Sequence, residues 1–200
     1  LPENKKNRLV RVGQVPVGGG APIAVQSMNN TDTRDVPASL AQIHELARAG
    51  CEITRLAIPD QEAAAALARI RPDSPLPIVA DIHFDYRLAL AAIKAGADKI
   101  RINPGNIGGM DRLRLVAAAA KEHGIPIRVG VNAGSLSRQI VDRHGGVNAA
   151  ALVESALEAI AMLEACDFYD IVVSIKAARP QLNLAACRQL AQKTDYPFHI

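Results

Sequence analysis

The sequence alternates short runs rich in β-branched residues with longer alanine-rich segments, and this alternation constrains the fold more than any other feature. Strand, helix and strand in succession predict βαβ units and a parallel sheet. Glycines at positions 50, 96 and 124 mark three helix ends. The predicted strands span 23–28, 53–58, 77–83, 99–103, 125–132 and 170–176, and the predicted helices 36–49, 61–70, 86–95, 112–123, 149–165 and 182–193.

Six units in a row favour a TIM-type (β/α)8 barrel, with a doubly wound sheet as the alternative. Such a barrel needs eight strands and about 250 residues, whereas residues 196–200 have the pattern of a seventh strand that is only beginning. We therefore expect a partial barrel over residues 22–200 and a natural polypeptide that continues beyond Ile200. Residues 1–21 are expected to form an N-terminal arm and a β-hairpin that turns at Gly13 and Gln14.

Charge and composition exclude several classes of protein. The net charge of +3 is too small for a nucleic-acid binder, and we interpret the basic residues 5, 6 and 8 as a solvated terminal run. No apolar run approaches the roughly 20 residues of a membrane span, and the N-terminus lacks the apolar core of a signal peptide. The cysteines Cys51, Cys166 and Cys187 are widely spaced, which favours free thiols in the cytoplasm over a disulfide or metal site.

Strand parity identifies which side chains face the barrel interior. Alternate residues of a strand face opposite sides, and in the second to sixth predicted strands one parity carries most of the bulky apolar residues. Ile127, Val129 and Val131 show this most clearly. The other parity therefore points inward, and it carries Arg55, Asp81, His83, Lys99, Arg101, Asn103, Arg128, Asn132, Ser174 and Lys176.

Four of these inward residues are cations near the carboxyl ends of their strands, where barrel active sites lie. They are Arg55, Arg101, Arg128 and Lys176. Four converging cations repel one another unless anions neutralise them, and Asp81 is expected to neutralise one. The pattern predicts a phosphate or diphosphate site, because a guanidinium group offers paired donors to such an anion.

Structural alternatives exist for each part of this pattern. Every arginine could pair with a local carboxylate, Asp81 and His83 could form an ion pair, and Asn103 and Asn132 could cap the loops that follow them.

The glycine-rich loop 103–109 precedes a helix whose N–H groups could bind an anion. The glycines at 18–20 precede a strand, and we interpret them as a connector. Thr33 or Asp35 is expected to cap the first helix.

Five motifs occur in order along the chain, at residues 25–35, 80–84, 101–108, 127–135 and 174–177. Together they resemble the 4-hydroxy-3-methylbut-2-enyl diphosphate synthases, iron–sulfur oxidoreductases of isoprenoid biosynthesis by the non-mevalonate pathway. The resemblance begins near Arg11 and covers nearly the whole chain. It implies the reductive ring opening and dehydration of 2-C-methyl-D-erythritol 2,4-cyclodiphosphate to 4-hydroxy-3-methylbut-2-enyl diphosphate, with two electrons and two protons.

The family resemblance also implies a cofactor and partners. A [4Fe–4S] cluster in a separate C-terminal domain receives electrons from flavodoxin or ferredoxin, and the enzyme is a homodimer. The cluster ligands are three cysteines and a glutamate of that domain, none of which this chain matches. The main acidic catalytic residue lies beyond Ile200, so this chain alone is expected to be inactive.

Carried over motif by motif, the resemblance implies roles for the inward residues. Asp81 and His83 are the candidate catalytic residues, which order the site or the substrate hydroxyls. The candidate substrate-binding residues are Arg55, Arg101, Asn103, Arg128, Asn132 and Lys176. Two other functions stay open: a cluster-free barrel enzyme for a phosphorylated substrate, similar to pterin synthases, and a non-catalytic phosphate-binding module.

Overall fold

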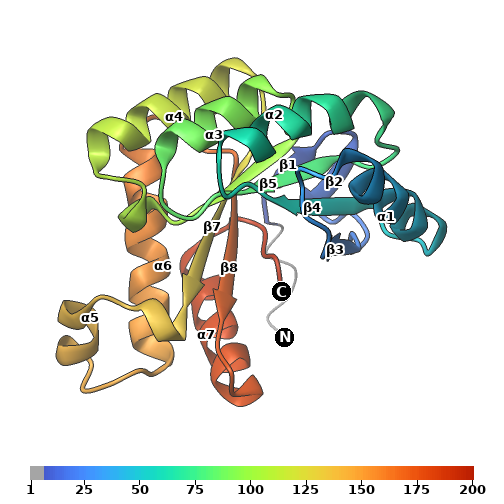
Figure 1. The fold of residues 1–200 in the computed structure, drawn as a ribbon. Helices are drawn as coiled ribbons and strands as arrows, with labels where there is room; N and C mark the ends of the chain where they lie inside the picture. Colours follow the sequence, from blue (N-terminus) through green and yellow to red (C-terminus); the bar gives the residue numbers. More distant parts are fainter. Residues whose placement is uncertain (1–6) are drawn as a thin grey trace.

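The computed structural model describes residues 7–200, so the basic residues at positions 5 and 6 lie outside the described part. These residues form a curled parallel sheet of six strands with helices along its outer face, and a separate two-stranded hairpin (Figure 1). The strand order β3-β4-β5-β6-β7-β8 follows the chain without a reversal. A doubly wound sheet reverses its order at a switch point, so the expected half-barrel is confirmed and the doubly wound alternative is wrong.

The predicted elements are all present. The strands are β1 (Leu9–Val12), β2 (Val15–Gly18), β3 (Gln26–Met28), β4 (Ile53–Ala57), β5 (Ile78–Asp81), β6 (Lys99–Ile102), β7 (Ile127–Asn132) and β8 (Ile171–Lys176). The α-helices are α1 (Val36–Arg48), α2 (Gln61–Ile70), α3 (Tyr86–Lys94), α4 (Met110–Glu122), α5 (Arg138–Arg143), α6 (Ala149–Glu164) and α7 (Pro180–Lys193). Short 3-10 turns occupy Arg71–Asp73, Pro104–Asn106 and Ala133–Ser135.

Two local differences from the expectation have physical reasons. The first predicted strand is shorter, because pairing with β4 begins where Gln26 lies opposite Ile53, and Ile23 ahead of it is 95% exposed. Helix α5 was not expected. It has only six residues, too few for a periodic pattern, and it begins where the Ser137 hydroxyl accepts a hydrogen bond from the Ile140 N–H.

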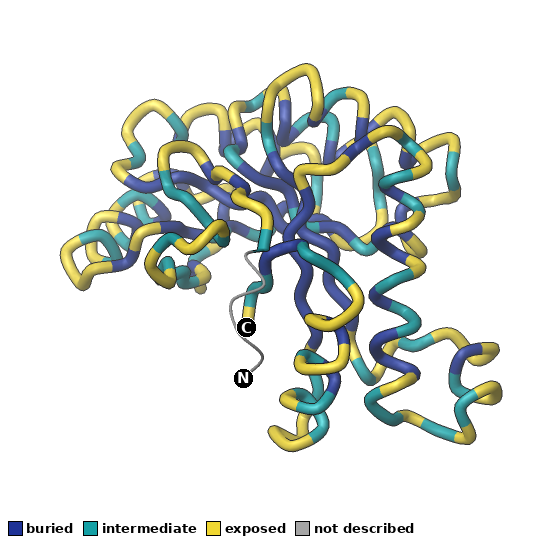
Figure 2. The backbone as a smooth tube through the Cα atoms, turned by 180° about the vertical axis from the view of Figure 1, so that it is seen from behind, coloured by how far each residue is buried: buried dark blue, intermediate teal, exposed yellow. Residues whose placement is uncertain are grey.

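The outward parity of the strands builds the main core with the helices. Helix α2 illustrates this: the Asp60 side chain caps its first turn by accepting from the Ala63 N–H, and Leu67 and Ile70 are fully buried. Each such buried side chain contributes about 1.5–3 kcal/mol. The Asp35 carboxylate caps α1 in the same way, as expected. In Figure 2 the buried backbone follows the strands, and the exposed backbone follows the loops and outer helix faces.

The hairpin β1–β2 covers the end of the barrel interior where the strands begin. We call this the lower end, and the end where the strands finish the upper end. It turns at Gly13 and Gln14 as predicted. Val12 packs there with Ile53 and Val79 in a small apolar cluster separate from the main core. Gly18 follows with a φ of +81°, and an added Cβ would collide with the carbonyl oxygen of Arg8.

The last residues run alongside β8 and lie near the first described residues. Phe198 forms a parallel bridge with Val173, as expected for the start of a seventh strand. Tyr196 is buried, its hydroxyl donates to Glu164 at 2.9 Å, and the Arg8 guanidinium lies 4.7 Å from its ring centroid. Within residues 7–200, the helices are all too short or too polar to cross a bilayer.

Candidate functional site

A row of charged side chains crosses the inner face of the sheet near the carboxyl ends of its strands. Asp81 of β5 is the register partner of Arg101 on β6, which in turn lies opposite Arg128 on β7. The Asp81 carboxylate accepts from Arg101 Nη1 at 3.1 Å, and Arg55 Nε of β4 lies 3.6 Å from its other oxygen. Asp81 supplies a single negative charge, as expected, but its carboxylate, 3% exposed, is shared between two arginines.

Arg128 is the most buried of the four cations, at 8% exposed. Its Nε donates to the Ser174 hydroxyl at 3.0 Å, whereas its buried Nη1 has no hydrogen-bond partner among residues 7–200. Burial, followed by the neighbouring Arg55 and Arg101 guanidinium groups, lowers the pKa of Arg128 to about 10, although Asp81 acts in the opposite direction. A buried guanidinium N–H without an acceptor is costly unless a ligand supplies one.

Arg55 and Arg101 both have guanidinium N–H groups whose hydrogen-bond acceptor is weak or missing. Arg55 directs Nε and Nη2 at the Met28 sulfur, at 3.1 and 2.8 Å, and a thioether is a weak acceptor that a phosphate oxygen would replace. The buried Nε of Arg101 also has no partner in the described part of the chain. Gly130 leaves room for this side chain, since a Cβ there would lie 3.3 Å from Arg101 Nε and from Ser174 Oγ.

The rim above these arginines carries the remaining predicted site residues. Asn132 and Lys176 are exposed register partners at the ends of β7 and β8. The Asn103 and Asn132 side chains accept from the N–H groups of Gly105 and Gly134, so both cap the turns that follow. His83 is exposed beside Phe84. The alternative of an Asp81–His83 ion pair was wrong, because Asp81 instead pairs with the two arginines.

All the predicted catalytic and substrate-binding residues meet in one cavity of about 400 Å³. Most of its lining is charged or amide-bearing, and its four cations face one carboxylate. This excess of positive charge suits a small, multiply charged anion. The lining comprises Arg55, Asp81, His83, Phe84, Arg101, Asn103, Asn106, Arg128, Gly130, Val131, Asn132, Ser135, Ser174 and Lys176.

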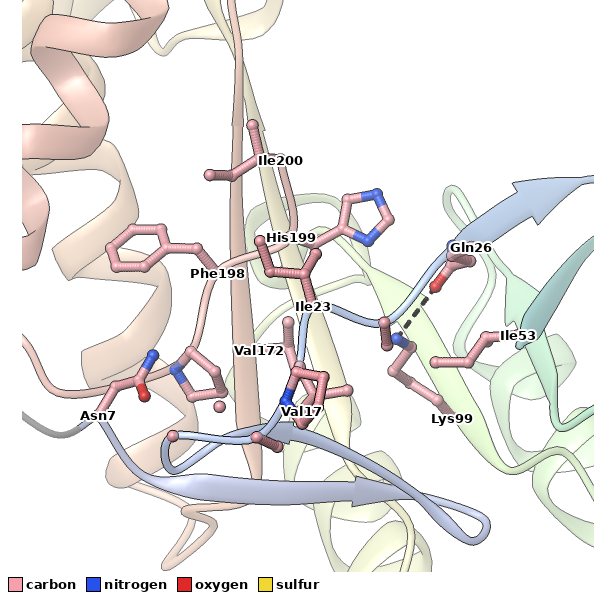
Figure 3. A pocket seen from close by; sticks show the side chains of 16 residues that line it. Asn7, Val17, Ile23, Gln26, Ile53, Lys99, Val172, Phe198, His199 and Ile200 are labelled. Carbon is pink, nitrogen blue, oxygen red and sulfur yellow. Dashed lines mark hydrogen bonds between the residues drawn. The ribbon is translucent and has the colours of Figure 1, made fainter. Parts of the chain in front are cut away.

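A second cavity, of about 480 Å³, lies lower, between the hairpin, β3 and the last residues (Figure 3). Lys99 of β6 enters it, and its Nζ donates to Gln26 Oε1 at 3.2 Å. Burial, followed by Arg128, Lys99 and Arg55, lowers the pKa of His199 in this cavity to about 3, so its imidazole is neutral.

Residues 7–200 match the GcpE TIM-barrel domain family. The chain belongs to this family. The resemblance drawn from the five sequence motifs is thereby confirmed.

Curated relatives of this GcpE barrel carry the name 4-hydroxy-3-methylbut-2-en-1-yl diphosphate synthase (flavodoxin). Those of Ruminiclostridium cellulolyticum and Geobacter sulfurreducens are 54% and 53% identical over 198 and 195 residues. The alignments cover 99% and 98% of this chain but 56% and 55% of the relatives. The chain thus spans about half the length of these relatives.

Solved structures with low sequence identity share the fold of the GcpE barrel. A truncated 3-deoxy-D-arabino-heptulosonate 7-phosphate synthase from Thermotoga maritima has a TM-score of 0.70 at 12% identity, covering 96% of this chain and 68% of that one. The 7,8-dihydropteroate synthase of Vibrio fischeri has a TM-score of 0.67 at 15% identity, covering 96% and 76%. At such identities the likeness concerns the fold alone.

The cysteines of the GcpE barrel do not fit an iron–sulfur cluster. Cys51 is buried and donates to the Ile53 carbonyl at 3.1 Å, and Cys166 donates to the Met162 carbonyl at 3.3 Å. Burial raises the pKa of the Cys166 and Cys187 thiols, which disfavours the thiolate that iron requires. Across residues 7–200, no three histidine, cysteine or acidic side chains converge on a possible metal position.

Four side chains in or near the site were not among the predicted site residues: Ser174 lines the anion cavity, Met28 contacts Arg55, and Lys99 and Gln26 line the second cavity. The parity of the strands predicted that Ser174 and Lys99 face inward. It did not predict that the Ser174 hydroxyl accepts a hydrogen bond from Arg128. Met28 and Gln26 belong to the first motif, yet no pattern showed that they contact Arg55 and Lys99. Met28 is the register partner of Arg55 on the neighbouring strand, whereas the contact between Gln26 and Lys99 joins β3 to β6 across the curved sheet.

Proposed function

We propose that this chain is the substrate-binding barrel of a 4-hydroxy-3-methylbut-2-enyl diphosphate synthase. The observation that carries the proposal is the buried Arg128, whose Nη1 lacks an acceptor in residues 7–200 while its cavity holds four cations and one carboxylate. A cyclic diphosphate supplies both the missing acceptors and the missing negative charge. The names of the relatives, at over 50% identity, support the same substrate.

In this proposal the residues of the barrel bind and orient the cyclic diphosphate. Arg55, Arg101, Arg128 and Lys176 hold its phosphate oxygens, and Asn103 and Asn132 donate from the amide groups that their turns leave free. Ring opening leaves negative charge on a phosphate oxygen, which preplaced cations stabilise without reorganisation. Asp81 keeps Arg55 and Arg101 in position and, with His83, orders the substrate hydroxyls.

The full reaction consumes two electrons and two protons and releases water. We propose a [4Fe–4S] cluster as the source of the electrons, supplied by flavodoxin as the names of the relatives suggest, with ferredoxin as the other candidate. The described residues offer no ligands for that cluster, so we place it in a part of the enzyme other than residues 7–200. The homodimer and the cytoplasmic location expected from the sequence belong to the same proposal.

Iron and acid-labile sulfide per chain test this proposal. The natural full-length polypeptide would be purified without oxygen and then assayed with reduced flavodoxin and the cyclic diphosphate. We expect about four of each element per chain and formation of the diphosphate product. Well-folded anaerobic protein with neither element would overturn the proposal and favour a cluster-free barrel enzyme of the pterin-synthase type.

A further inference from the structure

Lys99 is a buried cation that the proposed binding of the diphosphate does not use. It lies on β6 two residues before Arg101, so both side chains face the barrel interior, with Lys99 in the lower layer. The residue is 1% exposed. Its Nζ reaches across the interior to the Gln26 amide oxygen of β3, at 3.2 Å (Figure 3). A neutral amide oxygen does not compensate a buried ammonium charge.

The groups that face Lys99 from the surrounding strands are mostly positive or neutral. β3 offers Gln26, and His199 next to β8 is a neutral imidazole. The single inward carboxylate, Asp81 of β5, is engaged by two arginines, and no carboxylate within residues 7–200 pairs with Lys99. The other charged or polar inward groups are Arg55 of β4, Arg101 of β6, Arg128 of β7, and Ser174 and Lys176 of β8.

This environment makes the charge of Lys99 sensitive to the cavity above it. Burial, followed by Arg128 and Arg55, lowers the pKa of Lys99 to about 7. Arg128 and Arg55 are also the side chains that line the anion cavity. An anion bound there offsets the repulsion that they exert on the Lys99 ammonium group, because it brings negative charge next to both.

We propose that Lys99 takes up a proton when the diphosphate binds, and so couples ligand binding to proton uptake. This inference rests on the proposed function, since it needs a diphosphate in the upper cavity. Lys99 acts here as a positioning residue. In the free barrel above pH 7, Lys99 is mainly a neutral amine and adds no buried charge to the interior. In the complex it is a protonated ammonium group, which attracts the bound anion.

Proton uptake by Lys99 makes the affinity for the diphosphate decrease as the pH rises. A group whose pKa rises on binding takes up protons between its free and bound pKa values. The affinity is therefore constant below about pH 7, falls by up to about tenfold per pH unit above it, and becomes constant again above the bound pKa. The cyclic diphosphate has one strongly acidic oxygen on each phosphorus, so the ligand itself does not titrate in this range.

Calorimetry on the full-length, cluster-loaded protein without an electron donor tests the coupling. The cyclic diphosphate would be titrated near pH 7.5 in buffers with different ionisation enthalpies, and the slope of the observed enthalpy counts the protons. We expect an uptake of more than about half a proton per site. Lys99→Met and Lys99→Arg should lose this uptake, because neither side chain titrates in this range. Lys94→Met, a change at an exposed lysine on α3, should keep it.

Different calorimetric results would contradict the proposed function and the proton uptake by Lys99. Absence of any binding heat in the wild type would overturn the proposed function and this inference with it. Binding with the same enthalpy in every buffer would overturn the inference alone. Uptake that survives in Lys99→Met but disappears in His83→Gln would assign the proton to the rim histidine and would also overturn it. If Lys99→Met fails to fold, the Lys99→Arg variant decides.

Discussion

The lower and upper layers of the barrel interior are built from the same strands, yet they have opposite character. In the lower layer Ile53 and Val79 are buried and pack against Val12 of the hairpin. Two residues further along the same strands, Arg55 and Asp81 form part of a charged cavity. The lower layer gains free energy by burial, whereas the upper layer gathers charges that an anion must neutralise. Stability and binding are thus separated along β4 and β5, so changes two residues apart on these strands should affect different properties.

The largest effect is expected in the lower layer. Ile53→Ala removes a side chain that is 1% exposed and leaves a cavity beneath the hairpin, which should lower the free energy of unfolding by about 2–5 kcal/mol. Urea denaturation of the full-length protein measures this loss, and Ile53→Val should cost about 0.5–1.5 kcal/mol. Equal stability of Ile53→Ala and the wild type would remove the lower layer as a source of stability.

In the upper layer the expected effect is on binding. Arg128→Ala should weaken binding of the cyclic diphosphate by about 2–4 kcal/mol, because it removes paired donors to the anion. Calorimetric titration measures this, with Arg114→Ala as the control, since Arg114 pairs with Asp111 on the exposed face of α4. A loss below about 0.5 kcal/mol for Arg128→Ala would exclude this residue from the site.

Lys99 is a buried ionisable side chain in the lower layer, opposite Val79, and its effect on stability should depend on pH. Its folded pKa of about 7 lies below the unfolded value, so between these values the unfolded state binds more protons. The ligand-free wild type should therefore gain up to about 1.4 kcal/mol of stability from this group per unit of rising pH.

Lys99→Met lacks this gain, so its stability relative to that of the wild type should fall as the pH rises from 7 toward 10. Unfolding curves of both proteins across this range measure the difference. The exposed Lys94→Met should follow the wild type. A constant difference between Lys99→Met and the wild type would show that Lys99 does not titrate in this interval.

The smallest expected effect concerns the support of Arg128. Ser174→Ala removes the hydroxyl that accepts from Arg128 Nε at 3.0 Å, and it should weaken diphosphate binding by about 0.5–1.5 kcal/mol. In the Arg128→Ala background the same change should have almost no effect, since the partner is already gone. Additive losses in the double variant would show that Ser174 acts on the ligand independently of Arg128.

Much of this arrangement was predictable from local patterns. The outward parity of Leu56, Ile100 and Val129 appears in the main core, and the four cations predicted near the strand ends, Arg55, Arg101, Arg128 and Lys176, line one cavity. Helix α5 and the exact extent of β3 were not predictable, since a short helix has no period and a strand ends where its neighbour ends. The sharing of Asp81 between two arginines also depends on side-chain reach across adjacent strands.

The sequence by itself determined the order of the strands and helices, the face of each strand that points inward and the concentration of cations near the strand ends. These properties follow from periods of two and 3.6 residues, which act over a few neighbours. The tertiary structure alone decided that Arg128 lies against Ser174, and that Lys99 reaches Gln26, 73 residues away. The sheet's register and curvature set such distances, and the same closeness makes the charge on one side chain depend on the others.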